Sequence, residues 1–283
     1  MIKTIGVAGA GTMGSGIAFV CARHGFKTLL FDVNKTALEK AKSNIQSNIN
    51  YLVSKQKISS EDGENIFDRI NFTDSIKDCI ADLFIEAIVE KIDAKVSLFN
   101  QLASVNSPEI ILATNTSSLS VSLIQNEIPH PGNFVGMHFF NPAPVMKLVE
   151  VISGNLTNET TTKAIVDLCD CLGKMPVLCK DSPGFIVNRV ARAYYLEAME
   201  IVKNGIADIK DVDAIMEANG FKIGPFRLMD LIGLDINLAV SKSLYDAIPE
   251  ERLKPADLQI SKVQMGELGK KSGKGFYDYT ASS

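Results

Sequence analysis

Three glycines in the segment GAGTMG follow directly on a short apolar run near the start of the chain. Gly9, Gly11 and Gly14 have the spacing GxGxxG, and the residues after them have helical composition. In such a turn the first glycine permits a tight bend and the second leaves room for a pyrophosphate. The third glycine lets the helix pack close to the strand. A strand, this turn and a helix in that order predict the first unit of a dinucleotide-binding sheet, with Thr12 and Met13 of the motif also beside the cofactor.

Strand-like and helix-like segments alternate through the first half of the chain, which predicts an α/β fold with a doubly wound, mostly parallel sheet of the Rossmann type. Two further strand-like segments are expected to extend this sheet. The predicted strands are residues 3–8, 27–32, 82–87, 110–114, 133–139, 147–152 and 175–180, and the predicted helices are residues 12–24, 35–57 and 94–104.

The pattern changes at the tetrapeptide DSPG, residues 181–184. Beyond it, helical periodicity dominates and strand-like runs nearly vanish. We therefore predict two domains, a dinucleotide-binding domain over residues 1–182 and an all-α domain over residues 183–283. The helices predicted in the second domain cover residues 185–203, 209–218, 228–246 and 258–267.

Composition narrows the class of protein. The net charge of −4 shows no basic excess, so we expect no nucleic-acid partner. No apolar run reaches the ~18 residues that a membrane span needs, and the N-terminal residues have no signal pattern. The five cysteines match no zinc-binding spacing, and Cys169 and Cys171 are expected on different faces of one helix. These features predict a cytoplasmic protein with reduced thiols, no metal and no membrane contact.

Asp32 closes the second predicted strand, 18 residues after Gly14, near the position where dinucleotide-binding proteins place an acidic residue. A carboxylate there accepts hydrogen bonds from the ribose 2′-hydroxyl and repels a 2′-phosphate. The residue therefore predicts NAD as the cofactor. The alternative is a strand-end turn residue in the sequence Asp-Val-Asn.

The chain has three histidines, and they differ in setting. His24 ends the first predicted helix and is expected to cap its carbonyls, whereas His130 lies in a Pro-His-Pro turn. His138 ends a predicted strand and precedes a proline-rich loop, at the edge where parallel α/β sheets bind ligands. It is a candidate acid/base, with a buried structural histidine as the alternative. Ser117 follows a neighbouring strand and is either a site residue or part of a helix cap.

Several motifs together resemble the 3-hydroxyacyl-CoA dehydrogenase family, in its bacterial 3-hydroxybutyryl-CoA branch. The resemblance covers nearly the whole chain. The motifs are GAGTMGSGIA, EAIVEKIDAK, NTSSL, GMHFFNPAPVMKLVE, DSPGFIVNR and GKGFYDY.

The resemblance implies roles at matching positions. His138 matches the catalytic histidine and Glu150 the carboxylate that orients it. Ser117 and Asn188 match residues that hold the substrate's oxygens, and Asn141 matches a neighbour of the catalytic pair. The implied cofactor contacts are Glu90, Lys95 and Asn115, with Ser117 nearby. Taken alone, Glu150 would be a solvated acid at a strand end and Asn188 a surface residue.

The CoA tail is acidic, and lysines are the candidates to bind it. Lys55 on the long second helix and Lys274 near the C-terminus are expected to contact substrate and cofactor, respectively. The alternative for both is a solvated face.

The implied reaction is hydride exchange between NAD(H) and a 3-hydroxyacyl-CoA thioester, and the implied assembly is a homodimer formed through the helical domain. Two rivals stay open. One is another two-domain hydroxyacid or polyol dehydrogenase, many of which use lysine as acid/base. The other is a non-catalytic dinucleotide-binding protein, because fold alone does not determine function.

Overall fold

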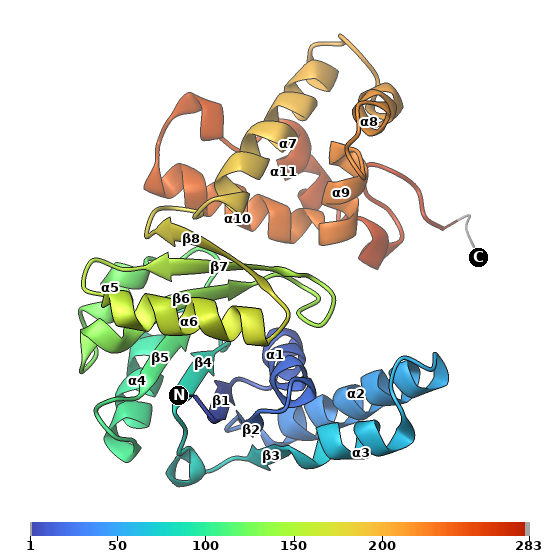
Figure 1. Ribbon diagram of the computed structural model, residues 1–283. Coiled ribbons are helices and arrows are strands. Elements are labelled where there is room, and N and C mark those ends of the chain that lie inside the picture. Colours follow the sequence, from blue (N-terminus) through green and yellow to red (C-terminus); the bar gives the residue numbers. More distant parts are fainter. Residues whose placement is uncertain (1, 281–283) are drawn as a thin grey trace. The chain divides into compact units, whose positions relative to one another are not determined.

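The structure, a computed structural model, describes residues 2–280 and divides into two compact units, Met1–Ser182 and Pro183–Ser283. The two units are described separately below. The predicted fold class is confirmed, since the first unit is a mostly parallel sheet flanked by helices and the second is helical (Figure 1).

The sheet of the first unit has eight strands among the described residues, in the order β3-β2-β1-β4-β5-β6-β7-β8. β7 runs antiparallel to β6, and the other neighbouring pairs are parallel. The central strands are buried on both faces, as expected where helices cover both sides. The strands are β1 Thr4–Ala8, β2 Lys27–Phe31, β3 Ile70–Thr73, β4 Leu83–Glu86, β5 Ile111–Thr114, β6 Phe134–Phe139, β7 Leu148–Ser153 and β8 Met175–Lys180.

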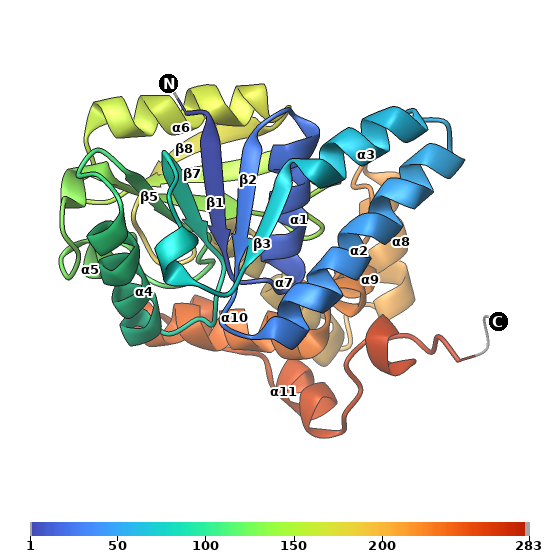
Figure 2. The same ribbon diagram turned by 90° about the horizontal axis from the view of Figure 1, so that it is seen from below.

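Helices pack around this sheet, and α2 and α3 lie side by side (Figure 2). The principal helices are α1 Thr12–Arg23, α2 Lys35–Ser54, α3 Ser60–Asp68, α4 Ile92–Val105, α5 Val121–Gln125 and α6 Glu159–Cys171. Cys169 is buried on α6 and Cys171 is exposed, so the prediction that they face different ways is confirmed. His24 caps the end of α1 as predicted, because its Nδ1 lies 2.9 Å from the carbonyl oxygen of Val20.

Apart from short 3-10 helices, four elements of the first unit were not predicted: α3, β3, α5 and α6. β3 has four residues and a partly exposed face, so its hydrophobic pattern is weak. α3 is polar, and its start depends on a capping box in which Ser59 and Asp62 bond each other's backbone. These short or polar elements are stabilised mainly by packing on their neighbours.

The second unit contains five α-helices among its described residues. The prediction of one helix over residues 228–246 is wrong, because Gly233 interrupts it with a φ of +103° that other residues rarely adopt. Positive φ angles also occur at Gly184 and Phe185, at the start of the unit. The first helix therefore begins at Val187, two residues later than predicted. The helices are α7 Val187–Lys203, α8 Ile209–Ala218, α9 Pro225–Ile232, α10 Leu234–Ala247 and α11 Asp257–Gln264.

Within residues 2–280, no helix combines the length and the apolar character needed to cross a membrane.

Candidate active site

The glycine motif forms the turn between β1 and α1. Gly9 has a φ of +103°, and a Cβ on Gly14 would lie 1.7 Å from the Gly9 carbonyl oxygen, so both positions require glycine. A Cβ on Gly11 would meet nothing within 4 Å, which leaves the space beside this backbone open. No acidic residue stands in the first turn of α1. An open, uncharged helix N-terminus is suited to the pyrophosphate of a dinucleotide.

Asp32 lies directly beside this turn. Its carboxylate accepts a hydrogen bond from the backbone N–H of Ala10 at 2.7 Å and another from Asn34 at 2.8 Å. The pairing of β1 with β2 places Ala8 opposite Phe31, so the residues that follow both strands emerge together. Thr12 is exposed and Met13 half-buried in the first turn of α1, next to the same opening. These residues have the arrangement that the motif predicts for the adenosine side of a dinucleotide.

His138 and Glu150 face each other across the antiparallel pair β6 and β7. The Nδ1 atom of His138 lies 2.7 Å from a carboxylate oxygen of Glu150. Glu150 is 1% exposed and His138 6% exposed, so the alternative of a solvated acid at residue 150 is wrong. An ionised carboxylate can only accept, so Nδ1 carries the hydrogen and Nε2 is the ring nitrogen that can exchange a proton.

Asn115 connects the ends of two strands at this edge. Its side-chain oxygen accepts a hydrogen bond from the backbone N–H of Phe139 at 2.8 Å. The amide therefore ties the residue after β5 to the strand that carries His138. Asn141 is exposed in the loop that follows, and the bond between Asn141 and Pro142 is cis.

A buried lysine that the sequence did not reveal holds this loop. Lys174 is 9% exposed and donates to the carbonyl oxygens of Ala143 at 2.5 Å and Met146 at 2.8 Å. Burial lowers the pKa of Lys174. Lys174 belongs to the turn before β8, so the loop beside His138 is anchored from a distant part of the chain.

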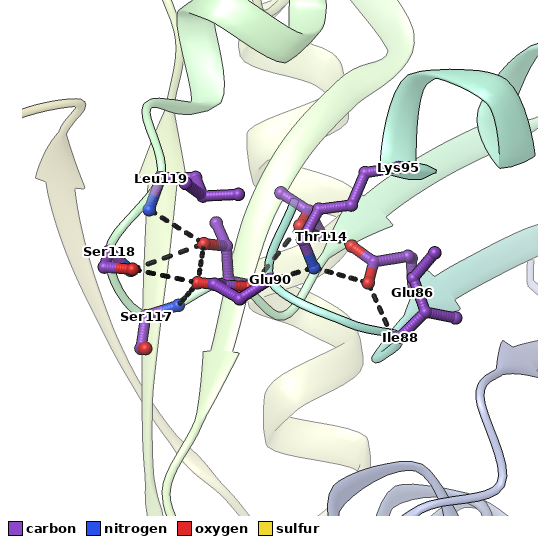
Figure 3. Close-up of polar contacts among 9 residues, drawn as sticks. Glu86, Ile88, Glu90, Lys95, Thr114, Ser117, Ser118 and Leu119 are labelled. Atoms are coloured by element: carbon purple, nitrogen blue, oxygen red, sulfur yellow. Dashed lines mark hydrogen bonds and ion pairs between the residues drawn. The ribbon is translucent and has the colours of Figure 1, made fainter. Parts of the chain in front are cut away.

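Glu90 and Lys95 belong to a network of polar contacts at the ends of β4 and β5 (Figure 3). Lys95 is 1% exposed and lies 2.5 Å from Glu86 and 3.1 Å from Glu90. Glu90 accepts from the hydroxyl of Thr116, from the backbone N–H of Ser117 at 3.1 Å and from the hydroxyl of Ser118 at 3.1 Å. Glu90 thus holds the segment that presents Ser117.

Glu86 is a member of this network that sequence reasoning missed. Its carboxylate also accepts from the Thr114 hydroxyl and the Ile88 backbone N–H, each at 2.7 Å. Burial raises the pKa of Glu86, while Lys95 opposes that shift; for Glu90, burial is outweighed by Lys95 and Thr116, which lower the pKa. An acid at the end of the apolar run LFIE was the available signal, because a buried strand end rarely carries an unpaired charge.

The side-chain contacts of Lys55 and Lys274 are with residues nearby in the sequence. Lys55 directly follows α2 as its C-cap residue, is exposed, and has its Nζ 5.9 Å from the centroid of the Tyr51 ring. Lys274 is 56% exposed and pairs with Glu267 at 2.6 Å. Asn188 lies in the first turn of α7 in the second unit and is half-buried. The roles predicted for these three residues remain predictions.

The sheet topology explains how the other predicted residues are brought together. β1, β2, β4, β5 and β6 are parallel, so the turns after them emerge at one edge. That edge carries the open N-terminus of α1, the carboxylate of Asp32, and an imidazole backed by a buried carboxylate. This combination is suited to proton transfer beside a bound dinucleotide.

Comparison with known proteins places the chain in a family. Residues 4–182 match the domain described as 3-hydroxyacyl-CoA dehydrogenase, NAD binding domain, and residues 184–279 match 3-hydroxyacyl-CoA dehydrogenase, C-terminal domain.

Relatives match over nearly the whole chain. A 3-hydroxyadipyl-CoA dehydrogenase from Escherichia coli K12 is 45% identical over 99% of this chain, which spans 60% of that relative's length. A probable 3-hydroxybutyryl-CoA dehydrogenase from Deinococcus radiodurans is 40% identical over 97% of this chain and 99% of its own. The crystal structure of (S)-3-hydroxybutyryl-CoA dehydrogenase from Ralstonia eutropha has a TM-score of 0.95 and 38% identity, covering 99% of this chain and 100% of the other. The chain therefore belongs to the 3-hydroxyacyl-CoA dehydrogenase family.

Proposed function

We propose that this protein interconverts (S)-3-hydroxyacyl-CoA and 3-oxoacyl-CoA thioesters with NAD(H), and that (S)-3-hydroxybutyryl-CoA and acetoacetyl-CoA are among its substrates. The observation that carries the proposal is the buried pair of His138 and Glu150, 2.7 Å apart at the ligand-binding edge of the sheet. An acid/base of this kind is what the oxidation of a secondary alcohol requires.

The proton transfer follows from the geometry of this pair. NAD(H), which the glycine turn and Asp32 would hold, would supply the hydride acceptor for the alcohol carbon or the hydride donor for the ketone. His138 takes the alcohol proton at Nε2 in one direction and donates it to the forming alkoxide in the other. Imidazole suits both directions because its reference pKa of ~6.5 is close to neutral pH. Glu150 holds the Nδ1–H tautomer and stabilises the imidazolium, as the carboxylate of a catalytic triad does.

The other residues orient substrate and cofactor in this proposal. The hydroxyl of Ser117 binds the reacting oxygen, and the Asn188 amide orients the thioester end, with Asn141 beside the catalytic pair. Glu90 and Lys95 position the Ser117 segment and contact the cofactor together with Asn115. Lys55 and Lys274 contribute positive charge near the CoA and cofactor phosphates.

The first unit is then the NAD-binding domain, and the second binds substrate and forms a homodimer. We also propose a cytoplasmic location, which agrees with the five free cysteines in the structure.

A spectrophotometric assay of NADH oxidation with acetoacetyl-CoA tests the activity directly. We expect turnover that depends on both substrates. The two rival functions predict otherwise, since a sugar-phosphate or hydroxyisobutyrate dehydrogenase would not reduce this thioester and a non-catalytic protein would not oxidise NADH. Binding of NADH without turnover of any 3-oxoacyl-CoA would contradict the proposal.

The position of Asp32 predicts that NADH is preferred to NADPH. A carboxylate beside the ribose repels a 2′-phosphate, and Lys35, which pairs with Asp74 at 3.1 Å, is a weaker phosphate ligand than an arginine. The double change Asp32→Ser and Asn34→Arg should narrow or reverse the preference, measured as kcat/KM for each cofactor.

The control for this experiment is Asn34→Arg alone. The Asn34 side chain caps α2 by accepting from Thr36 and Ala37, so its loss is expected to cost ~1 kcal/mol of stability without changing the ribose contact. A wild-type protein that prefers NADPH would show that Asp32 does not face the adenosine ribose.

A further inference from the structure

Two carboxylates share one ammonium group where β4 ends and α4 begins (Figure 3). The Nζ atom of Lys95 lies 2.5 Å from Oε1 of Glu86 and 3.1 Å from Oε2 of Glu90. No other cation of residues 2–280 forms an ion pair with either carboxylate. Glu86 and Lys95 are buried, whereas the Glu90 side chain is 37% exposed. We call these three residues, Glu86, Glu90 and Lys95, the Glu90 triad.

The hydrogen bonds of Glu86 leave no place for a proton on its carboxylate. It accepts from the backbone N–H of Ile88 and from the hydroxyl of Thr114, each at 2.7 Å. The Thr114 oxygen itself accepts from the backbone N–H of Thr116 at 3.2 Å, so its own hydrogen is directed to Glu86. Every partner of Glu86 is therefore a donor, which favours the ionised form. These donors, with Lys95, oppose the rise in the Glu86 pKa that burial causes.

Glu90 is surrounded by donors in the same way. Its carboxylate accepts from the hydroxyl of Thr116, from the backbone N–H of Ser117 at 3.1 Å and from the hydroxyl of Ser118 at 3.1 Å. For the pKa of Glu90, burial is outweighed by Lys95 and Thr116, which lower it. Both carboxylates are therefore ionised, and two negative charges against one positive charge leave the triad with a net charge of −1.

The surroundings of the triad do not cancel this charge. Lys91 and Asp93 are exposed at the start of α4, and their opposite charges offset each other. The N-terminus of α4 is partly positive, which offsets about half of one negative charge. Glu90 is the only member of the triad that reaches the surface, so the remaining negative charge is presented there.

The strand order places the triad in the half of the sheet that serves the second nucleotide. The segments β3-β2-β1 and β4-β5-β6 correspond to the two mononucleotide-binding halves of a Rossmann sheet, which bind a dinucleotide across the point where the order reverses. The glycine turn and Asp32 belong to the first half and are proposed to hold the adenosine side. The nicotinamide side then belongs to the second half, where Glu90 follows β4, Ser117 follows β5 and His138 lies in β6.

The proposed reaction moves one positive charge within this second half. When the alcohol is oxidised, its carbon loses a hydride to the nicotinamide ring and its hydroxyl loses a proton to Nε2 of His138. The positive charge of the oxidised ring is thereby lost, and a positive charge appears on the imidazole. Glu150 stabilises the charge on the imidazole, and an excess negative charge at Glu90 would stabilise it on the oxidised ring.

We propose that the Glu90 triad discriminates between the two redox states of the cofactor, because its net negative charge stabilises the positive ring of NAD⁺ and not the neutral ring of NADH. This inference rests on the proposed function and gives Glu90 a role beyond that of a cofactor contact. A carboxylate that only accepted hydrogen bonds from a ribose would favour both redox states equally.

The test compares dissociation constants for NAD⁺ and NADH, measured by calorimetry on the protein without substrate. Glu90→Gln keeps the size of the side chain and removes its charge. We expect the Kd for NAD⁺ to rise about 10-fold more than the Kd for NADH, the scale of one charge several ångströms away at an effective dielectric constant of ~20 or more. A 10-fold change in this ratio corresponds to a rise of ~30 mV in the potential of the bound cofactor.

Glu86→Gln separates the effect of charge from that of contact. Glu86 is 0% exposed and cannot touch the cofactor, but its removal leaves Lys95 to neutralise Glu90. The ratio of the two dissociation constants should therefore shift in the same direction as in Glu90→Gln. A shift in Glu90→Gln without any shift in Glu86→Gln would overturn the proposal, because the effect would then belong to a direct contact of Glu90.

Asp93→Asn is the matched control. It removes one negative charge from an exposed position in the first turn of the same helix, where water and salt screen the charge. The ratio should change by less than about twofold, because this charge is screened far more than that of the triad. An equal shift in Asp93→Asn and Glu90→Gln would overturn the proposal, since any acid near the start of α4 would then have the same effect.

A measurement on the wild-type protein decides the proposal even if the glutamine variants do not fold. The wild type should bind NAD⁺ about 10-fold more tightly than an analogue in which a neutral benzamide ring of the same shape replaces the nicotinamide. Equal affinities would overturn the proposal, as would an unchanged ratio in a folded Glu90→Gln variant. Absence of binding of both NAD⁺ and NADH to the wild type would instead contradict the proposed function.

Discussion

Replacement of His138 by glutamine is expected to lower kcat by ~10²–10⁴-fold, the usual effect of removing a general acid/base. Glutamine keeps similar size and polarity at the end of β6, but its amide cannot exchange a proton near neutral pH. The dissociation constant for NADH should change little, because the glycine turn and Asp32 that are proposed to bind the cofactor lie after β1 and β2. The measurement is steady-state turnover of acetoacetyl-CoA together with NADH binding followed by fluorescence.

The control for this experiment is His130→Gln, since His130 lies in a turn with a φ of +56° and makes no contact with the catalytic pair in the described structure. Its turnover should match that of the wild type. Near-normal turnover in a folded His138→Gln variant would remove His138 from the mechanism.

Glu150→Gln is expected to lower turnover by ~10²–10⁴-fold as well, with little change in KM for the thioester. An amide cannot stabilise an imidazolium as a carboxylate does, and it can turn its NH₂ group towards Nδ1 and select the wrong tautomer. The Glu150 side chain is buried directly opposite His138 in the register of β6 and β7. Water would therefore not stabilise the imidazolium in place of the lost carboxylate charge.

The readout that separates this role from a structural one is the pH dependence of kcat/KM. If Glu150 acts through the imidazole, the profile of Glu150→Gln must differ in shape from that of the wild type. Two profiles that coincide, at whatever absolute rate, would show that the carboxylate does not act on His138. Glu150→Asp provides a conservative comparison, because it keeps the charge and shortens the reach.

Local sequence determined much of the fold of the first unit. The glycine turn could be predicted because its conformations depend on a few adjacent residues, of which Gly9 and Gly14 admit no side chain. The buried parallel strands were visible as apolar runs, and their boundaries agree with prediction to within one or two residues. The division of the chain at Ser182 coincides with the change from alternating strands to helical periodicity.

Prediction was weaker where an element depends on distant partners. α3 and β3 are short or polar, and Gly233 divides a segment that has continuous helical periodicity in sequence. Periodicity records which face of a segment is buried. It does not record that one glycine within the segment adopts a left-handed conformation.

The sequence by itself determined which residues could do chemistry at the site, namely His138 at a strand end and Asp32 beyond the glycines. Tertiary structure decided their partners. Glu150 reaches His138 because β7 runs antiparallel to β6 in one particular register, and Lys95 is buried because Glu86 and Glu90 approach it from both sides. Arginine usually lies at the protein surface, yet packing buries Arg192 among the neutral side chains of Asn237 and Ser241. Side-chain chemistry is a property of each residue, whereas burial and pairing arise only when segments distant in sequence pack together, and these set the charge and hydrogen bonding on which function depends.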